Sequence, residues 1–184
     1  MYEVEIKVPA SVDRTRERLV DAGADQRGRR RQRDVYYDAP HRAFAETDEA
    51  LRIRHETASP AESADASTRL TYKGPRLDTA SKTRVEHETA VADADELADV
   101  LDRLGFEPAA TVEKQREYWT LDGFTLTLDV VSDVGEFVEI ERAVEDADAI
   151  DETRAAAVQT LARLDLDVDD QVTTSYLELL VDGD

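Results

Sequence analysis

Charged and apolar residues alternate along several short stretches of this chain. The clearest stretch is Glu3-Val4-Glu5-Ile6-Lys7-Val8, at the N-terminus. Because successive side chains of a strand point to opposite faces of a sheet, this pattern predicts a strand with one charged and one apolar face. The same alternation recurs in residues 50–54, 70–73, 84–88, 114–116, 125–129 and 137–141. The charged positions of these predicted strands are Glu3, Glu5, Lys7, Arg52, Arg54, Lys73, Arg84, Glu86, Glu88, Lys114, Arg116, Asp129, Glu139 and Glu141. The sequence therefore predicts a sheet whose charged face extends over at least seven strands.

Amphipathic helical patterns separate these predicted strands. A first helix is expected to begin after Ser11 and to end at Gly23. A second is expected to begin after Asp93 or Asp95 and to end at Gly105. Apolar residues at helical spacing predict two further helices, over residues 150–164 and 172–180.

Two other segments complete the expected organisation. Residues 34–38 predict a further strand, whereas residues 55–68 are polar and small and predict a loop. The mixture of strands and helices indicates an α+β fold. A chain of 184 residues is long enough for one full core, so we expect a single domain over residues 1–184.

The predicted helices need an apolar surface, which the apolar face of the strands supplies. The charged face is then left either to meet water, as one side of an ordinary antiparallel sheet, or to close on itself. This face carries seven acidic and seven basic residues; subtracting them from totals of 43 and 23 leaves 36 acidic and 16 basic residues elsewhere. Because the face is balanced while the rest is acidic, we expect about eight antiparallel strands to close into a barrel around it.

Composition sets the expected environment of the protein. The formal net charge is -20, and only four of the 23 basic residues are lysine, three of them on the charged face. Such a composition is typical of a halophilic protein in a salt-loaded cytoplasm, with an ordinary acidic protein as the alternative. The chain has no cysteine, which excludes disulfides and thiolate chemistry. No apolar run approaches the roughly twenty residues of a membrane span, and we expect a cytoplasmic protein.

The enclosed face also predicts a ligand. Burying charges is costly unless each is paired or ligated. Seven cations around one cavity call for a polyanion, and seven carboxylates there call for a hard divalent cation such as Mg²⁺ or Mn²⁺. A metal-bound polyphosphate satisfies both requirements.

The ordered set of charged motifs resembles the CYTH family, also called the triphosphate tunnel metalloenzymes. Glu3-Val4-Glu5-Ile6-Lys7 matches the Glu-x-Glu-x-Lys signature of that family. The resemblance continues in order through residues 34–38, 50–54, 71–74, 84–88 and 114–116, Asp129 and residues 139–141. The layout of residues 135–141 and 175–179 is most similar to the class IV adenylyl cyclase (CyaB-like) branch, and the acidic composition suggests a haloarchaeal member.

The resemblance implies an eight-stranded triphosphate tunnel with flanking helices. It implies catalytic roles for Glu3, Glu5 and Lys7. The implied metal ligands are Glu3, Glu5, Asp129, Glu139 and Glu141. The implied phosphate-binding residues are Lys7, Arg52, Arg54, Lys73, Arg84, Lys114 and Arg116. The resemblance does not assign a metal or phosphate contact to Glu86 and Glu88. Their candidate role is to orient the phosphate-binding cations.

The resemblance implies conversion of ATP to cyclic AMP and pyrophosphate. No motif in the chain corresponds to adenine recognition, so hydrolysis of inorganic, nucleoside or thiamine triphosphate remains an alternative. A non-catalytic module that binds polyphosphate or a nucleotide is a second alternative, and a barrel with a purely structural ion-pair network is a third. The chain also lacks the glycine-rich fingerprints of P-loop and dinucleotide-binding folds.

Residues 27–33 form the one basic run of the chain. A nucleic-acid site is one interpretation, but phosphate contacts of a surface patch weaken steeply with salt. We therefore favour a structural interpretation, in which these arginines pair with acidic neighbours. The expected partner is a small-molecule triphosphate, with no nucleic acid and no membrane, for a monomer or homodimer.

Overall fold

The computed structural model describes residues 2–59, 66–76 and 84–182. The strands are β1 (Tyr2–Pro9), β2 (Asp25–Asp38), β3 (Ala50–Ala58), β4 (Ala66–Arg76), β5 (Arg84–Ala90), β6 (Glu107–Leu121), β7 (Phe124–Val131) and β8 (Gly135–Val144). The α-helices are α1 (Val12–Asp21), α2 (Ala94–Arg103), α3 (Ile150–Arg163) and α4 (Tyr176–Asp182). Two short 3₁₀ helices cover Ala147–Ala149 and Val168–Asp170. No helix in these described ranges is both long enough and apolar enough to cross a membrane.

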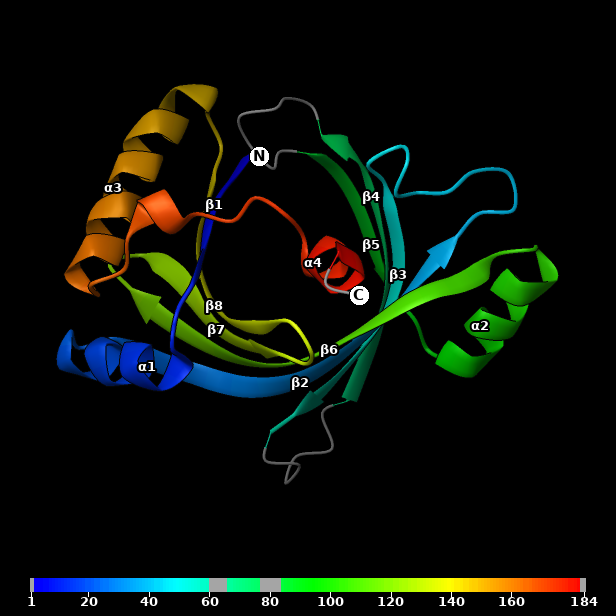
Figure 1. Cartoon of the computed structure of the whole chain (residues 1–184), viewed down its shortest axis with the longest axis horizontal. Helices are drawn as coiled ribbons and strands as arrows, with labels where there is room; N and C mark the ends of the chain where they lie inside the picture. The colour runs from blue at the N-terminus through cyan, green and yellow to red at the C-terminus, as the bar shows by residue number, and fades with distance from the viewer. Residues whose placement is uncertain (1, 60–65, 77–83, 183–184) are drawn as a thin grey trace. The chain divides into compact units, whose positions relative to one another are not determined.

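The strands form one eight-stranded sheet in the order β1-β8-β7-β6-β2-β3-β4-β5 (Figure 1). The pairs β1·β8, β7·β8, β6·β7, β3·β4 and β4·β5 are antiparallel. The predicted α+β fold with eight antiparallel strands and flanking helices is thereby confirmed. In the part of the chain described, this order ends at β1 and β5, and closure of the sheet into a barrel stays a prediction.

The chain divides into two compact units. The first comprises Met1–Arg30 and Lys114–Asp184, and the second comprises Arg31–Glu113. Strands β2 and β6 each contribute residues to both units. The expectation of a single domain over residues 1–184 stays a prediction.

In the first unit, α1 and α3 cover the apolar face of β1, β7 and β8 (Figure 1). Ile6, Leu128 and Val138 from the strands pack with Leu19 of α1 and Leu161 of α3. These five side chains are at most 1% exposed, so this face forms the core of the unit. Because strand side chains alternate, the charged residues of the same strands lie on the opposite face.

The ends of α1 are those that the sequence predicts. The Ser11 hydroxyl oxygen accepts a hydrogen bond from the Arg14 backbone N–H at 3.5 Å. Beyond the helix, Gly23 adopts a φ of +77°, which glycine reaches without the steric cost that a Cβ would add.

The second unit has its own smaller core. Val35 and Tyr37 of β2 pack with Ile53 of β3 and Leu101 of α2. The Asp93 carboxylate caps α2 by accepting a hydrogen bond from the Glu96 backbone N–H at 3.0 Å, which satisfies a donor that the helix itself cannot pair.

Four boundaries differ from the sequence-based expectation. β2 begins at Asp25 instead of residue 34, and the basic run lies within it. The expected loop over 55–68 is wrong at both ends, because His55 pairs with Thr68 and Glu56 with Ser67 between β3 and β4. Polar strand ends carry no apolar alternation, so the pattern alone ends these strands too early. Residues 60–65 of that expected loop lie outside the described residues.

The fourth boundary is the start of the C-terminal helix. The helix begins at Tyr176 instead of residue 172, because the preceding residues extend along β1. The Val172 backbone N–H donates a hydrogen bond to the Lys7 carbonyl oxygen at 2.8 Å. The Ser175 hydroxyl oxygen then accepts from the Glu178 N–H at 3.1 Å, at the start of the helix.

Several arginines of the basic run contact carboxylates within their own units. In the first unit, Arg29 Nε lies 3.3 Å from a Glu117 carboxylate oxygen. In the second unit, Arg31 and Arg33 both approach Glu113, at 3.5 and 3.6 Å. These are the contacts that the structural interpretation of the run predicts, and the absence of a nucleic-acid partner stays a prediction.

Candidate functional site

The charged face of the first unit carries a buried group of ionic side chains. We call Lys7, Lys114, Arg116, Asp129, Glu139 and Tyr176 the Asp129 cluster. Strand register brings its members together: Lys7 of β1 is the Cα partner of Glu139 on β8, and Arg116 of β6 is the partner of Asp129 on β7. The cluster therefore joins charges from four strands.

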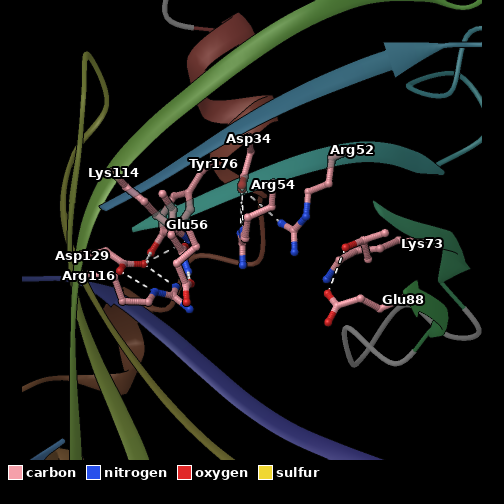
Figure 2. A network of polar contacts seen from close by, with 12 residues as sticks. Asp34, Arg52, Arg54, Glu56, Lys73, Glu88, Lys114, Arg116, Asp129 and Tyr176 are labelled. Carbon is pink, nitrogen blue, oxygen red and sulfur yellow. Dashed lines mark hydrogen bonds and ion pairs between the residues drawn. The ribbon is translucent and has the colours of Figure 1, made fainter. Parts of the chain in front are cut away.

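Arg116 is the centre of this cluster (Figure 2). Its Nε donates to Asp129 Oδ1 at 2.7 Å, and its Nη2 contacts both Asp129 Oδ2 and, at 2.6 Å, Glu139 Oε2. Lys114 Nζ lies 3.7 Å from Asp129 Oδ2. The Asp129 side chain is fully buried, so its charge depends on these cations in place of water.

The two carboxylates are held in their ionised form. Burial alone would raise the pKa of Asp129, but the positive charges of Arg116 and Lys114 outweigh it and hold that pKa well below its usual range. Burial also acts to raise the pKa of Glu139, and Arg116 again reverses the direction. Burial would lower the pKa of Arg116, and the two carboxylates raise it. All three groups are therefore charged at neutral pH.

The C-terminal segment contacts the same cluster. The Tyr176 hydroxyl donates to Asp129 Oδ2 at 2.8 Å, and Lys7 Nζ donates to the Thr174 carbonyl oxygen. Lys7 Nζ and Lys114 Nζ lie 4.3 and 4.9 Å from the centre of the Tyr176 ring. Burial, reinforced by Glu139 and Asp129, raises the pKa of Tyr176 far above its ordinary value, so the hydroxyl remains a donor.

Two further predicted metal ligands lie beside this cluster. Glu5 of β1 and Glu141 of β8 are Cα partners, and both are on the face that carries Glu139. Opposed carboxylates repel each other unless a cation lies near them. Glu3 pairs with Ala143 through the backbone, but its side chain lies outside the described residues. Among the described side chains, no group of three or more carboxylates or histidines is arranged to hold a metal ion.

These residues can still provide part of a metal site. Mg²⁺ and Mn²⁺ prefer oxygen ligands, and Mg²⁺ in particular is commonly held by one or two carboxylates, with substrate phosphates and water completing the shell. Glu5 and Glu141 offer such a carboxylate pair on adjacent strands. The donor chemistry of this face therefore fits a divalent metal that binds together with a phosphate.

The second unit carries a separate charged group on β2 and β3. We call Gln32, Asp34, Tyr36, Arg52, Arg54 and Glu56 the Asp34 cluster. Arg54 Nε and Nη2 donate to the two Asp34 carboxylate oxygens at 2.7 and 2.6 Å, and Arg52 Nη1 donates to Asp34 Oδ2 at 3.3 Å (Figure 2). Asp34 is 2% exposed, so its carboxylate contacts these arginines and is shielded from solvent.

Arg52 has one further donor in this cluster. Among the described residues, its Nε is buried and has no hydrogen-bond partner. A buried donor without an acceptor costs free energy, and such atoms in native proteins call for a ligand, ion or water. This N–H is therefore a donor for which the described residues supply no acceptor.

The edge of the second unit contains the remaining predicted residues. Lys73 Nζ lies 3.0 Å from Glu86 Oε2, and Glu88 accepts from the Thr71 hydroxyl at 3.0 Å and from Arg69 Nη1 at 2.9 Å. Glu86 is thus close enough to orient Lys73, the role that the resemblance leaves open for it. Arg84 begins β5, and its side chain lies outside the described residues.

The structure brings the predicted residues together in these groups and adds residues that the sequence analysis missed. Asp34 lies in a recognised motif, and its alternation with Tyr36 places both on one face, so a signal for it existed. Tyr176 and Thr174 follow no alternating pattern. Tyr176 lies in the motif over residues 175–179 that contributes to the resemblance, but its contact with Asp129 depends on the path of the C-terminal segment, which local patterns do not predict.

The sequence of this chain is similar to those of known proteins. A sequence model of the CYTH domain matches residues 1–176. A Methanocaldococcus jannaschii protein, whose name gives adenylate cyclase as its candidate activity, is 34% identical over 180 residues. That alignment covers 97% of this chain and 98% of the relative.

Solved structures share the same architecture. A protein of Pyrococcus horikoshii OT3 has a TM-score of 0.88 at 38% sequence identity, and the match covers 100% of both chains. A Hippeastrum protein, described as a candidate adenylyl cyclase with a dominant triphosphatase activity, has a TM-score of 0.66 at 18% identity. That match covers 100% of this chain and 96% of the other, and at this identity it demonstrates a shared fold alone.

Proposed function

Because the chain belongs to the CYTH family, we propose that it is an enzyme that acts on a triphosphate bound with a divalent metal ion on the charged face. Its leading activity is the conversion of ATP to cyclic AMP and pyrophosphate. The observation that carries the proposal is the buried Nε of Arg52, which has no hydrogen-bond partner among the described residues and can donate to an anionic oxygen of a ligand. The closed tunnel predicted from the sequence is part of the same proposal.

The cations of the face supply the phosphate-binding groups of this proposal. Those with described side chains are Lys7, Arg52, Arg54, Lys73, Lys114 and Arg116, and Arg84 completes the set. Arginine and lysine form strong charge-assisted hydrogen bonds to phosphate oxygens. In a site screened from water, these groups stabilise the charge that develops on the phosphates in the transition state.

The carboxylates of the face are the proposed metal ligands. Glu5 and Glu141 are the primary pair, since they are Cα partners on β1 and β8. Glu3 lies two residues before Glu5 on β1. Glu139 and Asp129 belong to the same set, although both are engaged by Arg116. When bound, Mg²⁺ or Mn²⁺ withdraws charge from phosphate oxygens and makes phosphorus more open to attack.

The cyclase reaction sets a demand on the residues that bind the substrate. The ribose 3′-oxygen bonds to the α-phosphorus, the bond to the bridging oxygen breaks, pyrophosphate leaves with that electron pair, and the hydroxyl proton is released. The attacking and leaving oxygens must be held in line. Lys7 and the arginines contribute to this alignment by fixing the orientation of the phosphates.

Triphosphate hydrolysis is the second candidate function. The Asp129 and Asp34 clusters consist largely of ionic groups suited to binding phosphate and metal. Such groups suit hydrolysis of tripolyphosphate, a nucleoside triphosphate or thiamine triphosphate as well as they suit cyclisation of ATP. The Hippeastrum relative is described as having a dominant triphosphatase activity. A non-catalytic polyphosphate-binding module is less well supported, because binding alone would need cations but not the facing carboxylates.

One assay separates these functions. The purified protein is incubated at high KCl with Mg²⁺ or Mn²⁺ and, in parallel, with ATP, tripolyphosphate or thiamine triphosphate. Cyclic AMP, pyrophosphate and phosphate are then resolved. Equal amounts of cyclic AMP and pyrophosphate from ATP support the cyclase. Release of phosphate without cyclic AMP, together with faster turnover of tripolyphosphate than of ATP, supports the triphosphatase. Binding without any product leaves the non-catalytic module.

A further inference from the structure

We propose that Asp34 is a positioning residue that orients Arg52 and Arg54 for a phosphate group. The inference rests on the proposed function and extends it to a residue outside the predicted phosphate and metal ligands. Asp34 lies on β2, the strand that neighbours β3 in the sheet, and its side chain is 3% exposed. A phosphate could reach the arginines that Asp34 contacts, whereas Asp34 itself, as an anion, would repel it.

The contacts of Asp34 fix one guanidinium group along its edge. Arg54 uses Nε and Nη2, so two parallel hydrogen bonds set both the position and the plane of the group. Arginine side chains are otherwise flexible, and ordering a long side chain costs conformational entropy. Asp34 therefore removes, in the ligand-free protein, an ordering cost that a phosphate would otherwise meet on binding.

The second arginine contacts Asp34 through one nitrogen atom. Arg52 Nη1 donates to Asp34 Oδ2 at 3.3 Å, while Arg52 Nε is buried with no partner among the described residues. Its side chain is 12% exposed. Asp34 thus keeps Arg52 in place but leaves one buried N–H for another acceptor. The same carboxylate also reduces the repulsion between two neighbouring guanidinium groups.

The rest of the cluster supports this arrangement. Gln32, two residues before Asp34 on the same face of β2, donates from Nε2 to Glu56 Oε2 at 2.5 Å, and Glu56 lies two residues after Arg54 on β3. Burial raises the pKa of Tyr36 on that face, and the charge of Arg52 opposes the rise. Within this cluster, side chains of β2 contact both the two cations and the carboxylate of β3.

Positioning and simple charge balance predict opposite changes in affinity. If Asp34 only balanced charge, Asp34→Asn would add one net positive charge and tighten the binding of a triphosphate. If Asp34 positions the arginines, the amide can accept from one guanidinium edge but its NH₂ group repels the other donors. Binding then weakens, by about tenfold or more, which is the usual scale for hydrogen bonds to charged groups.

The matched control is Glu117→Gln. Glu117 is also a buried carboxylate in a two-point contact with an arginine, accepting from Arg16 Nε and Nη2 at 3.1 and 2.7 Å. It lies on the face covered by α1 and belongs to neither cluster. Both variants should therefore lose stability, whereas only Asp34→Asn should lose affinity.

The test measures binding of tripolyphosphate by calorimetry at fixed KCl, with and without Mg²⁺, well below the unfolding temperature of each variant. Weaker binding by Asp34→Asn and unchanged binding by Glu117→Gln support the inference. Equal or tighter binding by Asp34→Asn overturns it and leaves the proposed function intact. Failure of the unaltered protein to bind tripolyphosphate overturns the proposed function, and the inference with it.

A second measurement reads the arginine directly. The Nε–H signal of Arg52 is followed by NMR and assigned with an Arg52→Lys variant. Tripolyphosphate should shift this signal strongly in the unaltered protein, because the buried N–H gains an acceptor. At equal saturation, the shift should be smaller in Asp34→Asn. The same shift in both proteins would show that Arg52 needs no positioning by Asp34 and would overturn the inference even if the two affinities differ.

Discussion

At the scale of single residues, the buried carboxylates of the two clusters and the proposed primary metal ligands should respond differently to substitution. Asp34, Asp129 and Glu139 contact guanidinium groups at short distance. Glu5 and Glu141 are Cα partners across β1 and β8 and are the primary pair of proposed metal ligands. Substitutions in the first group should affect folding as well as binding, whereas substitutions in the second should act mainly on metal-dependent activity.

Glu5→Gln tests this distinction. The change keeps the size of the side chain but removes an anionic oxygen ligand, so we expect turnover to fall by about a hundredfold or more while the thermal unfolding temperature stays close to that of the unaltered protein. Initial rates at increasing Mn²⁺ and calorimetric unfolding provide the two measurements.

Glu113→Gln is the control for Glu5→Gln. Glu113 also neighbours cations, Arg31 and Arg33, but its side chain is 41% exposed and belongs to neither cluster. This variant should retain its activity. Near-normal turnover of Glu5→Gln at saturating Mn²⁺ would eliminate Glu5 as a metal ligand.

Asp129 should make folding stability depend on acid pH. Its pKa is held well below the ordinary carboxylate value by Arg116 and Lys114, against the effect of burial. A depressed pKa stabilises the fold fully above the unfolded value of about 4, and this stability is lost as the pH falls from there toward the folded pKa.

The variant Asp129→Asn should therefore differ most from the unaltered protein at neutral pH. We expect its free energy of unfolding to be lower by about 3 to 5 kcal/mol at pH 7, because a buried arginine loses its partner. The difference should shrink below about pH 4. Denaturant titrations at a series of pH values measure it, with Asp25→Asn, whose carboxylate is 73% exposed, as the control. A difference that is independent of pH would contradict the coupling.

At the scale of elements, the C-terminal segment has the clearest effect on the site. Helix α4 spans only Tyr176–Asp182, and the residues before it contact β1 and the Asp129 cluster. A helix this short is not stable by itself in water. Its place therefore depends on tertiary contacts such as the hydrogen bond from Tyr176 to Asp129.

Tyr176→Phe tests the contribution of that hydrogen bond. The ring is retained, but the buried Asp129 carboxylate loses one donor, so we expect the free energy of unfolding to fall by about 2 kcal/mol. Urea titrations at neutral pH and fixed KCl measure the change. Tyr2→Phe, which alters an exposed tyrosine, is the control. An equal, small change in both variants would indicate that α4 is held by packing alone.

At the scale of the whole molecule, the net charge of -20 should make folding stability depend on salt concentration. Excess acidic charge repels itself and opposes the compact state, and dissolved salt screens this repulsion. We propose on this basis that the protein is adapted to high internal salt, as the composition predicts, and that a cytoplasmic location accompanies this adaptation.

Thermal unfolding as a function of KCl tests the salt adaptation. Between about 0.1 M and about 1 M salt the Debye length falls from about 10 Å to about 3 Å. We expect the unfolding temperature to rise by about 5 °C or more over this range. An unfolding temperature that is flat or falls with KCl would contradict the adaptation and favour an ordinary acidic protein.

The sequence by itself determined the central part of each strand, the two faces of the alternating segments and most helix ends, because these depend on residues close together in the chain. Alternation with period two places Glu5 and Lys7 on one face of β1, and Ser11 and Gly23 delimit α1 through local hydrogen bonds and backbone freedom. The family resemblance also follows from the order of such local motifs.

The tertiary structure alone decided which charges meet. Asp34 contacts Arg54 because β2 neighbours β3, and Arg116 contacts both Asp129 and Glu139 because β6, β7 and β8 lie in consecutive order with a fixed register. Tyr176 reaches Asp129 from 47 residues away. Local patterns set the direction of a side chain, but partners on distant segments are fixed only when hydrophobic burial and strand pairing bring those segments together.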